Sequence, residues 1–218
     1  MIGLFLLEAC APAARAPNLG SSRRGTAFAQ QVDQVARGKS RRIIVEDELI
    51  SDSDLAGLVD LAELRELTLR TTRVGDVGLS YIGKLVDLEK LVLGETSVTD
   101  AGLKSLTGLK QLKTLNFERA EATAAGFAEL TALEQLVLLR FGQSRIGDDA
   151  LAIIDRWPKL RSLILQRAPI TDAGLAHLKD QNLAGLESLY LEGTEVSEEG
   201  LADLQQALPR LHIHPHPD

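Results

Sequence analysis

Histidine and cysteine, the side chains that most often serve as bases, nucleophiles and metal ligands, are scarce in this chain of 218 residues. Three of the four histidines (His212, His214 and His216) alternate along the last segment, where two or three could meet at a metal ion. No cysteine or carboxylate is placed to complete such a site, so an exposed tail is the favoured interpretation. The single cysteine, Cys10, excludes an internal disulfide framework and a cysteine-rich zinc site. We therefore predict no metal and no cofactor.

Paired acidic residues could act as a general acid and a general base. The pairs are Asp52/Asp54, Asp148/Asp149 and Glu198/Glu199. All of them lie at one point of a recurring segment, where a helix is expected to begin, and a carboxylate there stabilises the positive end of the helix dipole. No Ser–His–Asp spacing and no glycine-rich phosphate loop stands out. The sequence therefore predicts a protein that is not an enzyme.

The recurring segment belongs to a repeated unit of 24 residues, with the pattern LxxLxLxx(T/S/A)x(V/I)(T/S/G)(D/E)xGLxx(L/I)xxL. Complete units cover 64–87, 88–111, 112–135 and 136–159. Two residues are added in 160–185, and 186–207 is two residues short. The phase extends back to 40–63 and forward to Leu208, Leu211 and Ile213, which begin an eighth unit that ends after its strand. This last alignment places Leu211 beside Leu189 and His212 beside Tyr190.

Each part of the unit has a physical interpretation. The alternation LxxLxL predicts a short strand with one buried face. Thr99, Thr171 and Ser197 suit the N-cap of a following helix, whose apolar stripe continues at spacings of three. A glycine inside the first helical turn costs helix stability. We therefore expect Gly102, Gly174 and Gly200 to pack closely against the neighbouring unit.

A strand, a turn and a helix in 24 residues make one coil of a solenoid, and stacking the coils buries the leucines in columns. The pattern resembles the leucine-rich repeat family, in its ribonuclease-inhibitor-like subtype, and is similar to bacterial proteins with 24-residue units. The resemblance covers about residues 40–213. It implies an α/β solenoid, a right-handed β-α superhelix or horseshoe, with a parallel sheet on the concave face. It also implies a role in protein recognition.

The concave face is formed by the strand positions that alternate with the leucines. We expect a protein or peptide to bind there, at Asn116, Arg119, Arg140, Ile164, Arg167 and Tyr190. Tyr and Arg are enriched at the centres of binding surfaces. The alternative is that these residues only favour strands and keep the sheet soluble. The face carries seven basic and six acidic residues and the whole chain a net charge of −7, which argues against a nucleic-acid partner.

The ends of the chain differ from the repeats. We expect a leader and linker over 1–25, an N-terminal cap helix over 26–39, the leucine-rich repeat domain of seven repeats plus a terminal strand over 40–213, and a tail over 214–218. The apolar run Ile2–Leu7 before Leu7-Glu8-Ala9-Cys10 resembles a bacterial lipoprotein cleavage box, with Cys10 as the lipid attachment site. The alternative interpretations are a leader with no targeting role and a misassigned start.

Two functions therefore remain open on the sequence. The first is a non-enzymatic protein-protein interaction module, expected to be a monomer. The second is a membrane-anchored envelope structural or adhesion lipoprotein, tethered at Cys10. The localisation is open in the same way. The protein is either cytoplasmic, or exported and anchored to a membrane as a lipoprotein.

Overall fold

The structure, a computed structural model, describes residues 26–70, 72–179, 183 and 185–215. The predicted leader with Cys10, and His216 in the predicted tail, lie outside these residues. Among the residues described, no helix has both the length and the apolar composition needed to cross a bilayer.

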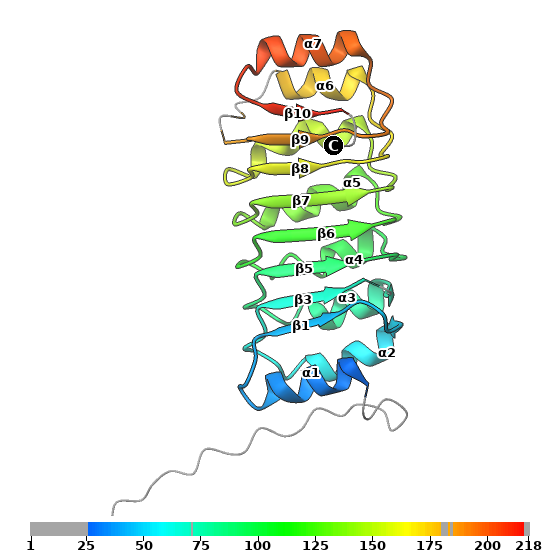
Figure 1. The fold of residues 1–218 in the computed structure, drawn as a ribbon, viewed down its shortest axis with the longest axis vertical. Helices are drawn as coiled ribbons and strands as arrows, with labels where there is room; N and C mark the ends of the chain where they lie inside the picture. The colour runs from blue at the N-terminus through cyan, green and yellow to red at the C-terminus, as the bar shows by residue number, and fades with distance from the viewer. Residues whose placement is uncertain (1–25, 71, 180–182, 184, 216–218) are drawn as a thin grey trace, which may run out of the picture.

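Eight strands form one parallel sheet in chain order, so each strand pairs with the strand of the next coil (Figure 1). They are β1 (Arg42–Val45), β3 (Glu66–Leu69), β5 (Lys90–Leu93), β6 (Thr114–Glu118), β7 (Leu138–Gly142), β8 (Ser162–Ile164), β9 (Ser188–Tyr190) and β10 (His212–His214). A second, two-stranded sheet joins β2 (Ile50–Ser51) to β4 (Thr72–Arg73).

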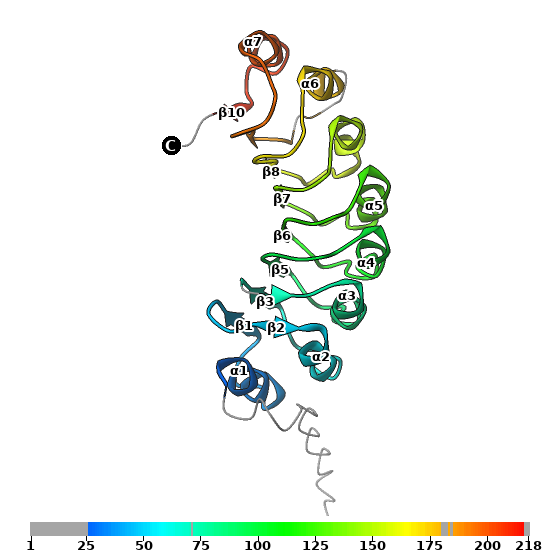
Figure 2. The same cartoon turned by 90° about the vertical axis from the view of Figure 1, so that its right-hand side faces the viewer.

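Helical segments return the chain from each strand to the next. They are α2 (Asp52–Leu55), η2 (Ala56–Leu58), α3 (Asp76–Ile82), α4 (Asp100–Lys104), α5 (Ala124–Glu129), η3 (Leu130–Ala132), η4 (Asp148–Arg156), α6 (Asp172–Lys179) and α7 (Glu198–Ala207). Figure 2 shows the helices on one side of the molecule and the strands on the other, with the strands inside the curve. The predicted α/β solenoid with a parallel sheet on its concave face is thus confirmed.

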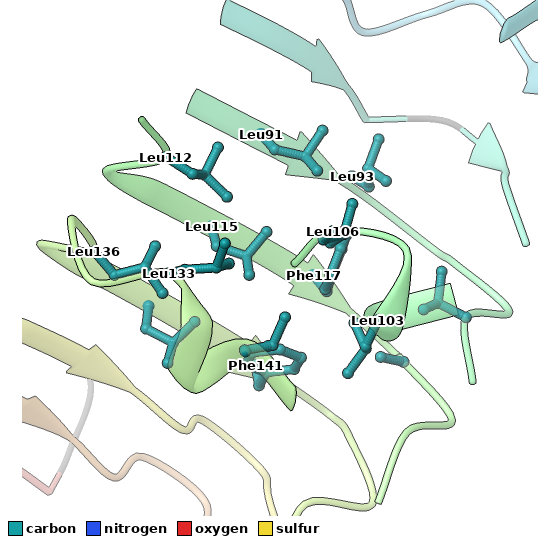
Figure 3. Packing of buried hydrophobic residues seen from close by; sticks show 14 of the residues in the cluster. Leu91, Leu93, Leu103, Leu106, Leu112, Leu115, Phe117, Leu133, Leu136 and Phe141 are labelled. Carbon is teal, nitrogen blue, oxygen red and sulfur yellow. The ribbon is translucent and has the colours of Figure 1, made fainter. Parts of the chain in front are cut away.

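The core consists of columns of apolar side chains that run from coil to coil. The strand register places one leucine of each coil from β3 to β9 opposite the next, in the column Leu67, Leu91, Leu115, Leu139, Leu163 and Leu189. All six are fully buried. Figure 3 shows the strand leucines Leu91 and Leu115 on the same side of the sheet as Leu103 and Leu106 of the helical segment. A single coil has no second layer of this kind, so burial depends on stacking.

A further helix, α1 (Ala27–Ala36), covers the β1 end of the sheet. It buries Phe28, Val32 and Val35. Its Gln31 side chain donates from Nε2 to the carbonyl of Ile44 and accepts at Oε1 from the Ile44 N–H, both at 2.7 Å. Two groups of an edge strand that would otherwise face solvent are therefore hydrogen-bonded, which discourages pairing with another chain.

The opposite end corrects the predicted alignment of the last unit. The structure pairs Ile213 with Leu189 and His214 with Tyr190, so the predicted pairs of Leu211 with Leu189 and of His212 with Tyr190 are wrong. The physical reason is that α7 continues to Ala207, and Leu208 closes that helix by donating its N–H to Leu204. Leu208 therefore belongs to the helical part of its coil, and residues 186–209 keep the full period.

A hydrogen-bond ladder joins neighbouring coils where their helices begin. Asp76 accepts the backbone N–H of Thr99 at 2.8 Å and its hydroxyl at 2.7 Å. Equivalent double bonds join Asp100 to Thr123, Asp148 to Thr171 and Asp172 to Ser197. The two bonds from Ser197, the side-chain bond first, lower the pKa of the Asp172 carboxyl from its ordinary value.

The repeat glycine makes room for this carboxylate. A Cβ atom added at Gly102 would lie 2.3 Å from Asp76 Oδ1, and one at Gly174 would lie 2.3 Å from Asp148 Oδ1. The same holds for Gly200, at 2.2 Å from Asp172 Oδ1. The predicted close packing of these glycines is confirmed. The interpretation of the acidic residues as helix-dipole partners alone was incomplete, because each aspartate also binds the next coil.

One junction lacks the ladder altogether, between units 112–135 and 136–159. Ala124 stands where the preceding coils and the two that follow have the acceptor aspartate. Gly147 stands where most coils have the donor hydroxyl; Gly75 also lacks it, but its backbone N–H still donates to Asp52 at 2.8 Å. Ala150 replaces the repeat glycine in the second of these units. The three departures are consistent with one another. Without an aspartate at position 124, unit 136–159 needs neither a hydroxyl to bind its carboxylate nor a glycine to leave space for it.

Aromatic side chains fill the same junction. The ring of Phe127 lies edge-to-face against Phe141, with centroids 5.3 Å apart, and against Trp157, at 5.1 Å. Trp157 Nε1 donates to the carbonyl of Leu130 at 3.0 Å. Edge-to-face rings add roughly 0.5–1.5 kcal/mol per pair beyond their area burial. Apolar packing therefore takes over part of the cohesion that hydrogen bonds supply at the other junctions.

The missing ladder predicts a local difference in hydrogen exchange. We expect the amide of Gly147 to exchange faster than the amides of Thr123 and Thr171, because only the latter two donate to an aspartate of the preceding coil. We also expect unit 112–135 to open before the other units. Native-state hydrogen exchange followed by NMR measures both, and equal protection of the three amides would contradict the prediction.

Candidate binding face on the concave sheet

Four of the six predicted site residues lie side by side in one row across the sheet. The register pairs Asn116 with Arg140, Arg140 with Ile164, and Ile164 with Tyr190. All four alternate with the buried leucines, and all four side chains are half-buried on the concave side. The row therefore offers an amide, a guanidinium, an aliphatic group and a phenol in succession. The Oδ1 atom of Asn116 is buried and has no hydrogen-bond partner among the residues that the structure describes.

The row continues onto the last strand. His214 of β10 is in register with Tyr190, and the two rings stack 4.2 Å apart with an interplanar angle of 6°. The sequence alignment had placed His212 at this position instead. Within the described residues, no group of three or more His, Cys, Asp or Glu side chains lies close enough to hold a metal ion.

The other two predicted residues, Arg119 and Arg167, follow the ends of their strands. Their φ angles are 58° and 56°, and the equivalent residues Glu95 and Gln143 have 47° and 53°. Such left-handed conformations are uncommon for residues other than glycine and carry a conformational cost. The stacked coils hold these residues in this conformation, because the chain must turn sharply away from the sheet at this point of the repeat. All four side chains are exposed along one rim of the concave face.

Two short chains of polar side chains run from coil to coil, one along this rim and one that starts from Arg140 of the row. Arg119 donates to Glu95 Oε1 at 3.1 Å and to Gln143 Oε1 at 3.0 Å. Arg140 Nη2 donates to Gln166 Oε1 at 3.0 Å, and Gln166 Nε2 donates to Glu192 Oε2 at 2.8 Å. These bonds link neighbouring coils and restrict the rotamers of the arginines. The positive groups are therefore held in defined positions before any ligand arrives.

Between the rim and the row lies a small polar cavity of about 180 Å³. It is lined by Arg140, Gly142, Gln143, Gln166, Arg167 and Glu192. The structure thus brings Arg140 and Arg167 together, while Asn116, Arg119, Ile164 and Tyr190 lie outside the lining. Sequence reasoning missed Gln143, Gln166 and Glu192 as site residues. Their positions in the repeat, directly after the strand core, would have pointed to them once adjacent coils were aligned.

No protein-family model matches the chain, and no curated protein matches it. Among solved structures it resembles an internalin (InlF) of Listeria monocytogenes, with a TM-score of 0.56 and 19% identity over 74% of this chain and 50% of that one. It also resembles internalin C2 of the same species, with a TM-score of 0.57 and 22% identity over 79% and 82% of the two chains.

A third similar structure is the leucine-rich-repeat ectodomain of the Arabidopsis thaliana membrane receptor kinase GASSHO1/SCHENGEN3, in complex with CASPARIAN STRIP INTEGRITY FACTOR 2. Its TM-score is 0.50, with 20% identity over 80% of this chain and 21% of that one. The chain therefore spans half of the first of these three structures and about a fifth of the third. At these identities the likeness concerns the fold, and together with the repeat and the parallel sheet it shows a leucine-rich repeat solenoid.

Proposed function

We propose that the protein is a non-enzymatic interaction module that binds a protein or peptide on its concave sheet. The observation that carries the proposal is the row Asn116, Arg140, Ile164 and Tyr190, which the strand register lays across four adjacent strands. Mixed polar and aromatic groups on a rigid surface bind with a low cost of ordering. The plant ectodomain, solved in complex with CASPARIAN STRIP INTEGRITY FACTOR 2, supports this kind of partner by analogy of fold.

The test is a double substitution in the row. A random peptide display library is selected on the immobilised full chain, and the affinities of the enriched peptides are then measured for the variant Arg140→Ala/Tyr190→Ala. We expect at least about tenfold weaker binding, because central Arg and Tyr side chains often dominate binding energy. The circular dichroism spectrum should be unchanged, since both side chains lie outside the leucine columns.

A matched control removes an arginine and an apolar side chain from the helical side. The variant Val77→Ala/Arg156→Ala changes exposed residues of α3 and η4 and should bind the enriched peptides with unchanged affinity. Enriched peptides that bind the Arg140→Ala/Tyr190→Ala variant as tightly as the unmodified chain would contradict binding at the row.

Finer features of the proposal rest on the sequence. The ribonuclease-inhibitor-like subtype is supported by the segment (V/I)TDxGL, whose aspartate and glycine have the ladder role described above. The partner is proposed to be a protein rather than a nucleic acid, and the module a monomer. The alternative, an envelope structural or adhesion lipoprotein, rests on the residues around Cys10. Mass spectrometry of the N-terminus would support it by finding a diacylglyceryl group on that cysteine.

A further inference from the structure

The polar cavity on the concave face is lined by hydrogen-bond donors that none of the described residues engages. Gln143 Oε1 accepts from Arg119 Nε, which fixes the orientation of the amide, since only an oxygen can accept that bond. The Gln143 Nε2 group then has no hydrogen bond to any other described residue. The guanidinium of Arg167 likewise makes no hydrogen bond or ion pair with the described part of the chain. Both groups donate only, so a ligand that satisfies them must be an acceptor.

The backbone places these two donors next to each other. Gln143 and Arg167 occupy equivalent positions of adjacent coils, both in the left-handed conformation, and both line the same cavity. Beside them, Gly193 has a φ of 68°, and a Cβ atom there would lie 2.9 Å from Arg167 Cγ. The glycine therefore leaves space for the aliphatic stem of Arg167. Residues of two adjacent coils thus leave room for the stem of Arg167 beside Gln143.

The charged residues that follow the ends of the strands also distinguish this place. Arg70 pairs with Glu46 at 2.8 Å, and Arg119 pairs with Glu95 at 3.1 Å, so these two cations have acidic partners within the chain. Of the six residues that line the cavity, only Glu192 is acidic, and its Oε2 already accepts from Gln166. Two arginines and one glutamate leave the lining with a net positive charge.

We propose that this cavity is a subsite for a carboxylate of the bound peptide, held by the Arg167 guanidinium and the Gln143 amide. The proposal rests on the proposed function, since it names the partner chemistry of the same face. A guanidinium presents a planar pair of donors that matches the two oxygens of a carboxylate. The carboxylate belongs either to an acidic side chain or to the C-terminus of the peptide.

The test uses the peptides enriched from the display library on the unmodified chain. Each peptide is synthesised in its original form, with every acidic side chain converted to its amide, and with an amidated C-terminus. Dissociation constants are measured by fluorescence anisotropy for the full chain and for the variants Arg167→Gln and Arg145→Gln. Arg145 is an exposed arginine of the same unit as Gln143 and does not line the cavity, so it controls for net charge.

We expect the removal of one carboxylate to weaken binding to the unmodified chain about tenfold. The same removal should change binding to Arg167→Gln only slightly, because in that variant the peptide carboxylate has no guanidinium to bind. The form that loses affinity identifies the source, an acidic side chain or the C-terminus. Arg145→Gln should bind within about twofold of the unmodified chain, as exposed charges contribute little. Gly193→Ala keeps every charge but crowds Arg167, and it should weaken binding as Arg167→Gln does.

Two outcomes would overturn the proposal. In the first, both neutralised forms bind the unmodified chain as well as the original peptide does. In the second, Arg167→Gln loses no more affinity than Arg145→Gln. Suppose that one of these outcomes is found, but the enriched peptides still bind Arg140→Ala/Tyr190→Ala more weakly than the unmodified chain. The proposed function then stands, and only the carboxylate subsite fails. If no enriched peptide depends on Arg140 and Tyr190, the proposed function fails, and the subsite fails with it.

Discussion

Replacing Gly174 by alanine is expected to lower the free energy of unfolding by about 3 kcal/mol. The added Cβ would lie 2.3 Å from Asp148 Oδ1, 3.0 Å from Asp148 Cγ and 3.1 Å from Leu151 Cδ1. The carboxylate must move, and it then loses the two bonds that it accepts from Thr171, at 2.8 and 2.6 Å. Overpacking costs roughly 1–3 kcal/mol, and a lost hydrogen bond to a charged group adds a comparable amount.

A second substitution tests this cause directly. In Asp148→Ala/Gly174→Ala the methyl group meets no carboxylate, so the double variant should be destabilised by clearly less than the sum of the two single variants. The chain already contains this combination at one junction, where Ala124 and Ala150 occupy the two positions. Urea denaturation followed by circular dichroism measures all three variants. Strict additivity would contradict the proposed clash.

Gly108→Ala is the matched control for this cycle. A Cβ atom at Gly108 would have only one neighbour within 4 Å, the carbonyl oxygen of Gly83 at 3.7 Å. The substitution should therefore be neutral, or slightly stabilising through the lower entropy of the unfolded chain. A large loss of stability at Gly108 would show that alanine is tolerated poorly at glycines of this solenoid in general, without any specific contact to an aspartate.

The repeat explains why so much of the fold was predictable. A strand alternation and a helical stripe recur in phase, so errors in one unit are corrected by the others. The close packing of Gly174 followed from its cost inside a helix. The second role of Asp148 did not, because its partner Thr171 lies 23 residues further along and each unit alone assigns both residues to their own helix. The last unit was misaligned because no later unit constrained its phase.

The residues of the concave face were predictable in their positions but only in part in their mutual contacts, and binding there stays a prediction. Alternation with buried leucines identifies Arg140 and Ile164 as outward-facing residues. It also places Gln166 on the concave side, but it does not predict that Gln166 joins Arg140 to Glu192 across three adjacent coils. Such a chain depends on side-chain rotamers and on the left-handed turn after each strand. Neither leaves a signature in the residue types, since Arg, Gln and Glu are ordinary surface residues.

Leu163→Ala is expected to cost about 2–5 kcal/mol of unfolding free energy. Leu163 is fully buried in the column between Leu139 and Leu189, and both neighbours belong to other coils. The lost side chain leaves a cavity that the columns cannot close without shifting two adjacent strands. Because each coil contacts only its neighbours, the loss should concentrate in the C-terminal coils, beyond the junction that lacks the ladder.

The adjacent residue supplies the control for this substitution. Ile164 belongs to the same strand but faces the concave side and is half-buried, so Ile164→Ala should cost about 1 kcal/mol or less, mainly in strand propensity. The two variants therefore separate stability from binding within one strand. We expect Leu163→Ala to weaken the solenoid, and Ile164→Ala to weaken the proposed peptide binding in a molecule that remains folded. Equal stability losses at both positions would mean that the two faces of β8 are not distinct, and a loss below about 1 kcal/mol at Leu163 would remove it from the core.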